Sequence, residues 1–125
     1  MGIWVMVDVV ANHVAPVGMD FSQIYPINQP YHYHDPCNIV DWNNQYQVEH
    51  CRLADLPDLD QDQPWVRQYL KDWIRNLVQT YNFDGIRIDT VPHVEKPFWS
   101  EYVSYANVYS IGEIFNGNDA YVADY

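Results

Sequence analysis

Short apolar stretches alternate with amphipathic ones along much of this chain. The first apolar stretch, Ile3–Val10, is nearly continuous and rich in Val, and only Asp8 interrupts it. A run of this kind is typical of a strand that is buried on both faces of a parallel sheet. Because an unpaired buried charge is costly, Asp8 is expected to be paired or to lie near the strand end.

A long amphipathic helix is predicted over Pro64–Tyr81. Its apolar residues fall at positions 66, 69, 70, 73, 74, 77, 78 and 81, which is the spacing of one helix face. Pro64 suits the first turn, and Asp62 or Gln63 can cap it. The helix is expected to end at Asn82.

Two further strands are predicted around a second helix. Gly85 precedes a short strand, IRID, that ends at Asp89, and a helix over Lys96–Ala106 begins with Pro97. The last predicted strand is Val108–Ile114. Strands that alternate with helices imply right-handed crossovers and a parallel sheet, so the fold class is α/β.

The segment Ala11–Gln63 is long, polar and irregular, with prolines at positions 16, 26, 30, 36 and 57. Because a structureless connection of that length is rare in a compact domain, we interpret it as an inserted subdomain. Short strands are predicted within it at Cys37–Val40 and Gln47–Arg52. The predicted organisation is therefore a first strand in residues 1–12, an insertion over 13–62 and the remaining helices and strands over 63–125.

The composition narrows the range of partners. The chain has 6 basic and 17 acidic residues and a net charge of -11, and such a surface repels nucleic acids and anionic membranes. No apolar run approaches the roughly 20 residues that span a bilayer. The 5 Trp and 11 Tyr residues suit core packing and also the stacking of flat sugar faces.

The two cysteines, Cys37 and Cys51, allow two interpretations. They are free thiols of a cytosolic protein, or they form a disulfide that closes the polar segment Asn38–His50. A loop of this length would contribute about 3 kcal/mol in the chain-entropy model. Composition alone does not choose between the two.

Arg87 and Asp89 form the first candidate catalytic pair. They are two positions apart on a predicted strand, so their side chains share a face, while Ile86 and Ile88 take the other face. We expect Arg87 to keep the Asp89 carboxylate ionised at neutral pH. An ionised, oriented carboxylate is what a glycosyl nucleophile requires, and a structural Arg–Asp pair is the alternative.

Glu113 follows Gly112 at the end of the next predicted strand. The ends of adjacent parallel strands project into the same space, which is the active-site face of a β/α barrel. A retaining glycosidase needs two carboxyl groups about 5 Å apart, one ionised and one protonated. Asp89 and Glu113 are therefore a candidate catalytic pair.

Several residues carry the hard oxygen donors that Ca²⁺ prefers. They are Asn12, Glu49, Asp58 and His93, the last through its backbone carbonyl. Their spacing is not that of an EF-hand, and solvated loop residues are the alternative interpretation.

The histidines of the insertion give no comparable signal. His32, His34 and His50 have no cysteine or helical partner at metal-ligand spacing, so the sequence predicts no zinc site.

Four ordered sequence blocks carry a resemblance to a known family, the α-amylase family of glycoside hydrolases (family thirteen). The blocks are DVVANH (Asp8–His13), LPDLD (Leu56–Asp60), GIRIDTVPH (Gly85–His93) and GEIFNG (Gly112–Gly117). Within the family the chain looks most like the fungal, Taka-type members. Supporting this are QVEHC (Gln47–Cys51), WSEY (Trp99–Tyr102) and the strand VYSIGE.

The resemblance implies a fold and an activity. The fold is a (β/α)₈ (TIM) barrel, of which this chain supplies strands three to five and an inserted domain B between strand three and helix three. The activity is endo-hydrolysis of α-1,4-glucosidic bonds in starch or a similar α-glucan, with retention of configuration. The resemblance also implies a secreted enzyme, with a signal peptide outside these residues, and we expect a monomer.

The resemblance assigns roles to six residues near the strand ends. Asp89 matches the nucleophile, Glu113 the proton donor, and Arg87 the arginine that supports the nucleophile. His13 matches a histidine that contacts the sugar at the cleaved bond, and Asp8 a structural carboxylate. His93 also belongs to the implied substrate-binding set.

The resemblance also implies structural bonds in the insertion. Asn12, Glu49, Asp58 and the carbonyl of His93 match calcium ligands that tie domain B to the barrel. Cys37 and Cys51 match a domain B disulfide.

Two features depart from the family pattern. Fungal members usually carry Lys where this chain has Pro92, so the leaving-group side and the product pattern are expected to differ. Pro92 is also expected to push Val91 toward an extended conformation, with the His93 carbonyl still usable for calcium.

The second departure is length. A whole barrel needs about 250 residues, and the family's third carboxylate is absent from these 125 residues. We therefore expect these residues alone to be inactive and poorly folded, because sheet edges are left unpaired. Alternatives are another family-thirteen enzyme, such as an α-glucosidase or a glucanotransferase, and a non-catalytic amylase-like binding protein.

Overall fold

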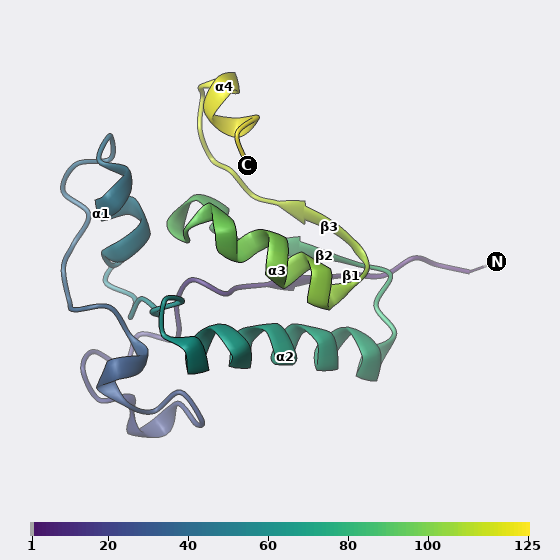
Figure 1. Ribbon diagram of the computed structural model, residues 1–125, viewed down its shortest axis with the longest axis horizontal. Coiled ribbons are helices and arrows are strands. Elements are labelled where there is room, and N and C mark those ends of the chain that lie inside the picture. Colours follow the sequence, from purple (N-terminus) through teal and green to yellow (C-terminus); the bar gives the residue numbers. More distant parts are fainter. Residues whose placement is uncertain (1) are drawn as a thin grey trace.

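The computed structural model describes residues 2–125 and shows a parallel sheet connected by helical crossovers (Figure 1). The strands are β1 (Met6–Val9), β2 (Gly85–Ile88) and β3 (Tyr109–Gly112), in the order β1-β2-β3. The crossovers run through α2 (Pro64–Tyr81) and α3 (Lys96–Ala106). The predicted α/β alternation and both predicted helices are confirmed.

The two long helices form one core with the sheet. Ile86 and Ile88 of β2 are buried, as expected, and face the apolar sides of both helices. The buried helix residues of this core are Val66, Leu70, Ile74, Val78, Phe98, Trp99, Tyr102 and Ala106. The opposite face of β2 is left for Arg87, which pairs in register with Asp8 of β1.

Both helices end in the same way. Asn82 follows α2 with φ 53° and Asn107 follows α3 with φ 52°, both in the left-handed region that Asn tolerates at a helix end. This confirms the predicted end of the first helix. At its start, Gln63 takes the cap position and Pro64 the first turn, but the Gln63 side chain makes no capping bond.

The exposed part of β1 corrects one expectation. The strand is shorter than the predicted Ile3–Val10, and Ile3 and Trp4 are 87% and 84% exposed. Burial on both faces was wrong for this part of the chain, because Val9 packs in the core with the helices while Met6 and Asp8 are exposed. The third strand is likewise shorter than predicted, and Ile111 in it is 47% exposed.

The segment between β1 and α2 gathers at the end of the sheet toward which the strands run (Figure 1). It contains two short 3₁₀ turns, Phe21–Gln23 and Pro30–His32, and the helix α1 (Gln45–His50). Isolated bridges join His13 to Asp58, Tyr33 to Leu59 and Asn38 to Arg52. These contacts, rather than a regular sheet, give the segment its shape.

The two short strands predicted in this segment were wrong. Most of Gln47–Arg52 belongs to α1, because the side chain of Asn44 accepts a hydrogen bond from the Gln47 backbone and starts a helix. Cys37–Val40 contributes only the bridge between Asn38 and Arg52.

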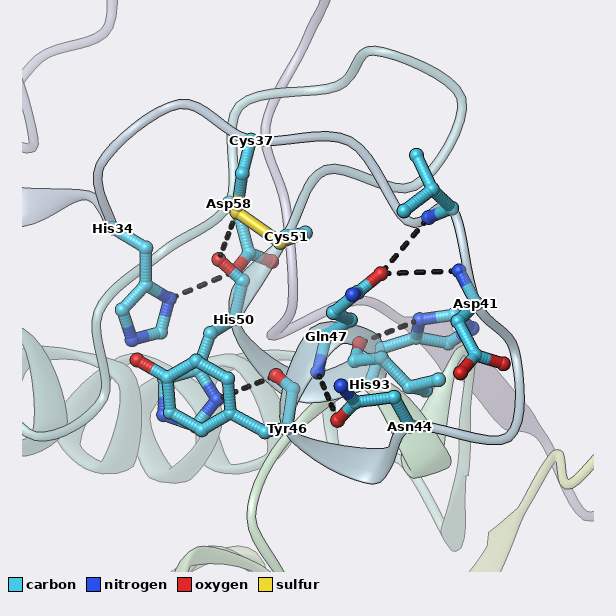
Figure 2. The surroundings of a disulfide bond; sticks show 12 residues. His34, Cys37, Asp41, Asn44, Tyr46, Gln47, His50, Cys51, Asp58 and His93 are labelled. Atoms are coloured by element: carbon cyan, nitrogen blue, oxygen red, sulfur yellow. Dashed lines mark hydrogen bonds and ion pairs between the residues drawn. A yellow bond between two sulfur atoms is a disulfide. The ribbon is translucent and has the colours of Figure 1, made fainter.

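Cys37 and Cys51 form a disulfide across the base of α1, as the family resemblance implied (Figure 2). None of the helices in the described residues is long and apolar enough to cross a membrane.

Candidate active site

Arg87 is the centre of a cluster of carboxylates at the carboxyl ends of the strands. Its Nη1 lies 2.9 Å from Oδ1 of Asp8 and 2.8 Å from Oδ1 of Asp89. Its Nη2 lies 2.9 Å from Oε1 of Glu113. The parallel register explains this, because Asp8 is opposite Arg87 and Asp89 is two residues further along on the same face.

The shared guanidinium limits the separation of Asp89 and Glu113. The terminal nitrogens of a guanidinium are about 2.3 Å apart, so the bonded oxygens of these two residues are at most about 8 Å apart. Both side chains remain partly exposed, at 27% and 39%. Both are therefore accessible to solvent within reach of one cation.

Backbone bonds beyond the strand ends hold both acidic residues in place. The Asp89 N–H donates to the Val9 carbonyl at 2.9 Å, and the Glu113 N–H donates to the Ile88 carbonyl at 2.7 Å. These bonds extend the parallel ladders by one residue. The two carboxyl groups thus project from fixed backbone rather than from free loops.

The surrounding carboxylates also change the pKa of Arg87. The hydrogen bond to Asp8, followed by that to Asp89 and by the charges of Asp8 and Glu113, raises the pKa of the Arg87 guanidinium. Arg87 is therefore a permanent cation at this site, and Asp8 is paired with it although its side chain is 65% exposed.

Thr90, directly after Asp89, is a site residue that the sequence did not predict. It has φ 54° and ψ 38°, a left-handed conformation that is strained for a β-branched residue. Its N–H donates to Oε2 of Glu113 at 3.4 Å. The sequence carries no signal for this, because Thr rarely adopts such angles.

Val91 does not have the extended conformation that was expected before Pro92. It begins the 3₁₀ turn η3 (Val91–His93) and is not extended, although Pro92 follows it. Its N–H donates to the Glu113 carbonyl, and its own carbonyl accepts from the buried indole N–H of Trp99 at 2.9 Å. These bonds and the burial of Val91 outweigh the local preference before proline.

Two histidines border the carboxylates. Burial lowers the pKa of both His13 and His93, and the negative charge of Asp89 partly opposes this in each case. Both rings are therefore neutral at pH 7. Nδ1 of His93 lies 3.1 Å from the carbonyl of Val48, which ties the loop after β2 to α1.

A cavity of about 390 Å³ opens beside Glu113. Thr90, Pro92, Trp42 and Phe115 are among the residues that line it. Pro92 thus lies at the site, as the sequence led us to expect, and it offers no donor to a ligand there.

Three predicted calcium ligands meet at one point. One end of the Asn12 amide lies 2.7 Å from the carbonyl oxygen of His93 and 2.8 Å from Oδ1 of Asp58. The other end lies 3.1 Å from Nδ1 of His13. The amide has two orientations here: its nitrogen donates to both oxygens, or its oxygen joins them in a cluster of three that only a cation would stabilise.

The burial of Asp58 supports a cation at this point. Its side chain is only 3% exposed, and burial raises the pKa of its carboxyl to about 6, although a hydrogen bond from His34 at 2.8 Å opposes the shift (Figure 2). A buried carboxylate beside two further oxygens gains most from a hard cation. The donor set therefore fits Ca²⁺.

Glu49 makes a different set of contacts. Its carboxylate accepts a hydrogen bond from Gln45 at 2.8 Å, and it lies in a group with His50 and Glu95. The structure thus brings together Asn12, Asp58 and the His93 carbonyl, but it shows no comparable contact between Glu49 and them.

The class of the protein follows from these features. A parallel β/α arrangement that presents paired carboxylates at the carboxyl ends of its strands is typical of the catalytic face of a β/α barrel. The chain belongs to the α-amylase catalytic domain family, whose model ("Alpha amylase, catalytic domain") matches residues 1–119.

Individual relatives agree with this membership. The chain is 36% identical to Alpha-amylase 1 of Lipomyces kononenkoae, over 99% of this chain and 21% of that protein. Among solved structures it is similar to an α-amylase from Malbranchea cinnamomea (42% identity, TM-score 0.89, 95% of this chain and 27% of that one). It is also similar to an α-amylase from Geobacillus thermoleovorans complexed with acarbose (33% identity, TM-score 0.88, 98% of this chain and 28% of that one). The chain thus spans about a quarter of the length of these relatives.

Proposed function

We propose that this chain is the part of a retaining α-amylase that carries the nucleophile and the proton donor. The protein that contains it hydrolyses internal α-1,4-glucosidic bonds of starch or a similar α-glucan. The observation that carries this proposal is the single Arg87 guanidinium that binds both Asp89 and Glu113 at adjacent strand ends. Family membership and fungal relatives named as α-amylases support it.

In the first step, Asp89 is the nucleophile. Its carboxylate oxygen attacks the anomeric carbon, and the bond from that carbon to the leaving oxygen breaks. The Arg87 cation holds the Asp89 oxygen 2.8 Å from Nη1, which pairs the carboxylate with a positive charge and orients it. The product is a glycosyl ester on Asp89.

Glu113 provides the proton and later removes one. As an acid it turns from Arg87 and protonates the leaving oxygen, and as a base it deprotonates the water that opens the glycosyl ester. The ion pair between Glu113 and Arg87 is the arrangement of the deprotonated form, which is the base of the second step. Two inversions of the anomeric carbon give net retention.

His13 and His93 complete the proposed substrate contacts. Because burial lowers the pKa of both rings, each is neutral and adds no charge near Arg87. Nδ1 of His93 donates to the Val48 carbonyl, so its Nε2 can accept a hydrogen bond from a sugar hydroxyl. Nε2 of His13 can donate one when its Nδ1 accepts from the Asn12 amide. The cavity beside Glu113 is on the proposed leaving-group side, where Pro92 removes a cationic contact.

The segment 13–62 is proposed as domain B of the barrel, held by a calcium ion. Asn12, Asp58 and the His93 carbonyl would hold the ion, with Glu49 as the fourth proposed ligand after a side-chain rotation. When bound, Ca²⁺ would neutralise the buried Asp58 and tie the loop after β2 to the insertion. Domain B, the disulfide and a secreted enzyme are consistent with one another, since extracellular proteins retain disulfides.

Removal of calcium is expected to destabilise the whole protein. Chelation should lower the Tm of the unsubstituted protein. Asp58→Asn removes the buried carboxylate ligand, so this variant should have a lower Tm in calcium, and chelator should not change that Tm. Differential scanning calorimetry with and without chelator measures both effects. Asp35→Asn, an exposed carboxylate in the same segment, is the matched control and should keep the full response. A Tm of the unsubstituted protein that chelator does not change would contradict the calcium assignment.

Product analysis tests the proposed activity. An endo-acting amylase should cut starch to a mixture of oligosaccharides and act weakly on maltose. An α-glucosidase would prefer maltose, and a glucanotransferase would give transfer or cyclic products. The assay uses the whole polypeptide that contains this chain, because residues 2–125 lack neighbours for the outer edges of β1 and β3.

A further inference from the structure

The parallel pairing of β2 with β3 becomes irregular where it reaches Glu113. Ile88 is opposite Gly112, and the Glu113 N–H donates to the Ile88 carbonyl at 2.7 Å. In a regular parallel ladder the next bond would run from the Thr90 N–H to the Glu113 carbonyl. The Val91 N–H makes that bond instead, at 3.2 Å. The chain after β2 therefore has one residue more than the ladder uses, which is a β-bulge at Thr90.

The bulge gives the Glu113 side chain a second hydrogen-bond donor. The Thr90 N–H is released from the ladder and donates to Oε2 of Glu113 at 3.4 Å. The other carboxyl oxygen, Oε1, lies 2.9 Å from Nη2 of Arg87. One oxygen of the carboxyl group is thus held by a cation and the other by an uncharged backbone N–H.

The backbone, and not the side chain, explains the conformation of Thr90. Its φ of 54° is strained for a β-branched residue. The Thr90 hydroxyl is buried and has no hydrogen-bond partner within residues 2–125, so it does not stabilise these angles there. Strain of this kind persists where the surrounding structure enforces it, and it is common at functional sites.

Close packing between Val91 and Gly112 enforces the bulge. Val91 is buried, and its carbonyl accepts from the indole N–H of Trp99 at 2.9 Å. A Cβ atom added at Gly112 would lie 2.8 Å from Cγ2 of Val91, closer than the 3.0 Å that real Cβ atoms keep. The turn after β2 can therefore close on β3 only because residue 112 has no side chain.

We propose that Thr90, Val91 and Gly112 are positioning residues for Glu113, in which the bulge aims the carboxyl group and Gly112 admits the bulge. This inference rests on the proposed function, where Glu113 is the proton donor. The acid form carries its proton on the oxygen that leaves Arg87, while the carbonyl oxygen keeps the bond from the Thr90 N–H. The proton donor therefore stays fixed at one oxygen when it turns toward the leaving group.

Gly112→Ala in the whole protein is the direct test. The added methyl group should push Val91 and Thr90 away from Glu113. We expect kcat/KM on starch to fall about 10- to 100-fold, because a misplaced acid loses part of its contribution to the first step. On α-maltotriosyl fluoride kcat/KM should stay within about threefold, since fluoride leaves without a proton. A merely structural role would lower both values equally.

Two further variants separate positioning from stability. In Gly112→Ala combined with Val91→Ala, the nearest remaining Val91 atom is Cβ at 3.6 Å, an ordinary contact. This double variant should therefore regain the ratio of kcat/KM on starch to that on the fluoride found in Val91→Ala alone. Gly85→Ala is the matched control, because its methyl group would meet the Tyr109 carbonyl at 3.0 Å at the other end of β2. It should lower Tm without changing the ratio.

A crystal structure of the unsubstituted whole protein gives a result that does not depend on the folding of a variant. It should show Thr90 at positive φ, with its N–H directed at the Glu113 carboxyl group. A regular bond from the Thr90 N–H to the Glu113 carbonyl would overturn the proposal. So would a starch-to-fluoride ratio that Gly112→Ala does not change, or one that the double variant does not restore. Starch hydrolysis by the unsubstituted protein tests the proposed function separately, so these outcomes leave that function intact.

Discussion

Asp89→Asn is expected to lower kcat on starch by at least about 10³-fold, equivalent to about 4 kcal/mol of lost transition-state stabilisation. The amide cannot form the glycosyl ester. It nevertheless keeps the shape of the side chain. Its Oδ1 can still accept the hydrogen bond from Arg87, which is 2.8 Å long in the unsubstituted protein. The fold and glucan binding should therefore survive while turnover collapses. Starch hydrolysis measured beside glucan affinity separates the two effects.

Asp72→Asn provides the matched control for this substitution. Asp72 is on α2, where it pairs with Arg75, and it takes no part in the carboxylate cluster. Its replacement should leave kcat within about twofold of the unsubstituted value, since exposed ion pairs contribute little to stability. Unchanged turnover in Asp89→Asn would show that the protein is a glucan-binding relative or that another residue is the nucleophile.

Glu113→Gln should give the second largest loss of kcat, and the loss should depend on the leaving group of the substrate. Loss of the proton donor is expected to lower kcat on starch by about 10²–10⁴-fold. A substrate with a fluoride leaving group needs no proton, so the first step should remain fast and the glycosyl-enzyme should accumulate. Added azide should restore turnover, because this anion attacks the anomeric carbon without a general base.

A matched control uses another glutamate that is paired with cations. Glu101 accepts bonds from Arg67 and Lys71 at 2.8 and 2.7 Å on the α2–α3 surface. Glu101→Gln should lower Tm modestly and should not change the dependence on the leaving group. If Glu113→Gln loses activity equally on starch and on the glycosyl fluoride, Glu113 is not the proton donor.

The sequence predicted those parts of the fold that depend on local patterns. The apolar spacing of Pro64–Tyr81 and the Asn after it defined α2, because a helix face and a left-handed helix end are both readable from neighbouring residues. The face shared by Arg87 and Asp89 followed from strand geometry in the same way. Parallel order then brought Glu113 to the same end.

Other parts depend on contacts that the local sequence does not encode. The prediction of a strand at Gln47–Arg52 failed because the Asn44 side chain caps a helix there. Val91 entered a 3₁₀ turn against the preference before proline, because Trp99 and Glu113 bond to its backbone.

In the candidate site too, contacts between residues close in sequence could be predicted, whereas contacts between distant residues could not. The Arg87–Asp89 pair could be predicted, but the contact of the same guanidinium with Asp8 and Glu113 required the register of three strands. The strained Thr90 had no sequence signal at all. The meeting of Asn12 with Asp58 and His93 was available only through the family resemblance.

Covalent trapping tests the central claim most directly. Glu113→Gln in the whole protein would be treated with a 5-fluoroglycosyl fluoride of α-configuration, which forms a glycosyl-enzyme that hydrolyses slowly, and the labelled peptide would be sequenced by mass spectrometry. We predict that the sugar is bound to the Asp89 side chain, in the peptide that contains Gly85–Asp89. A label on a different carboxylate, or the absence of any label together with products of inverted configuration, would contradict the account.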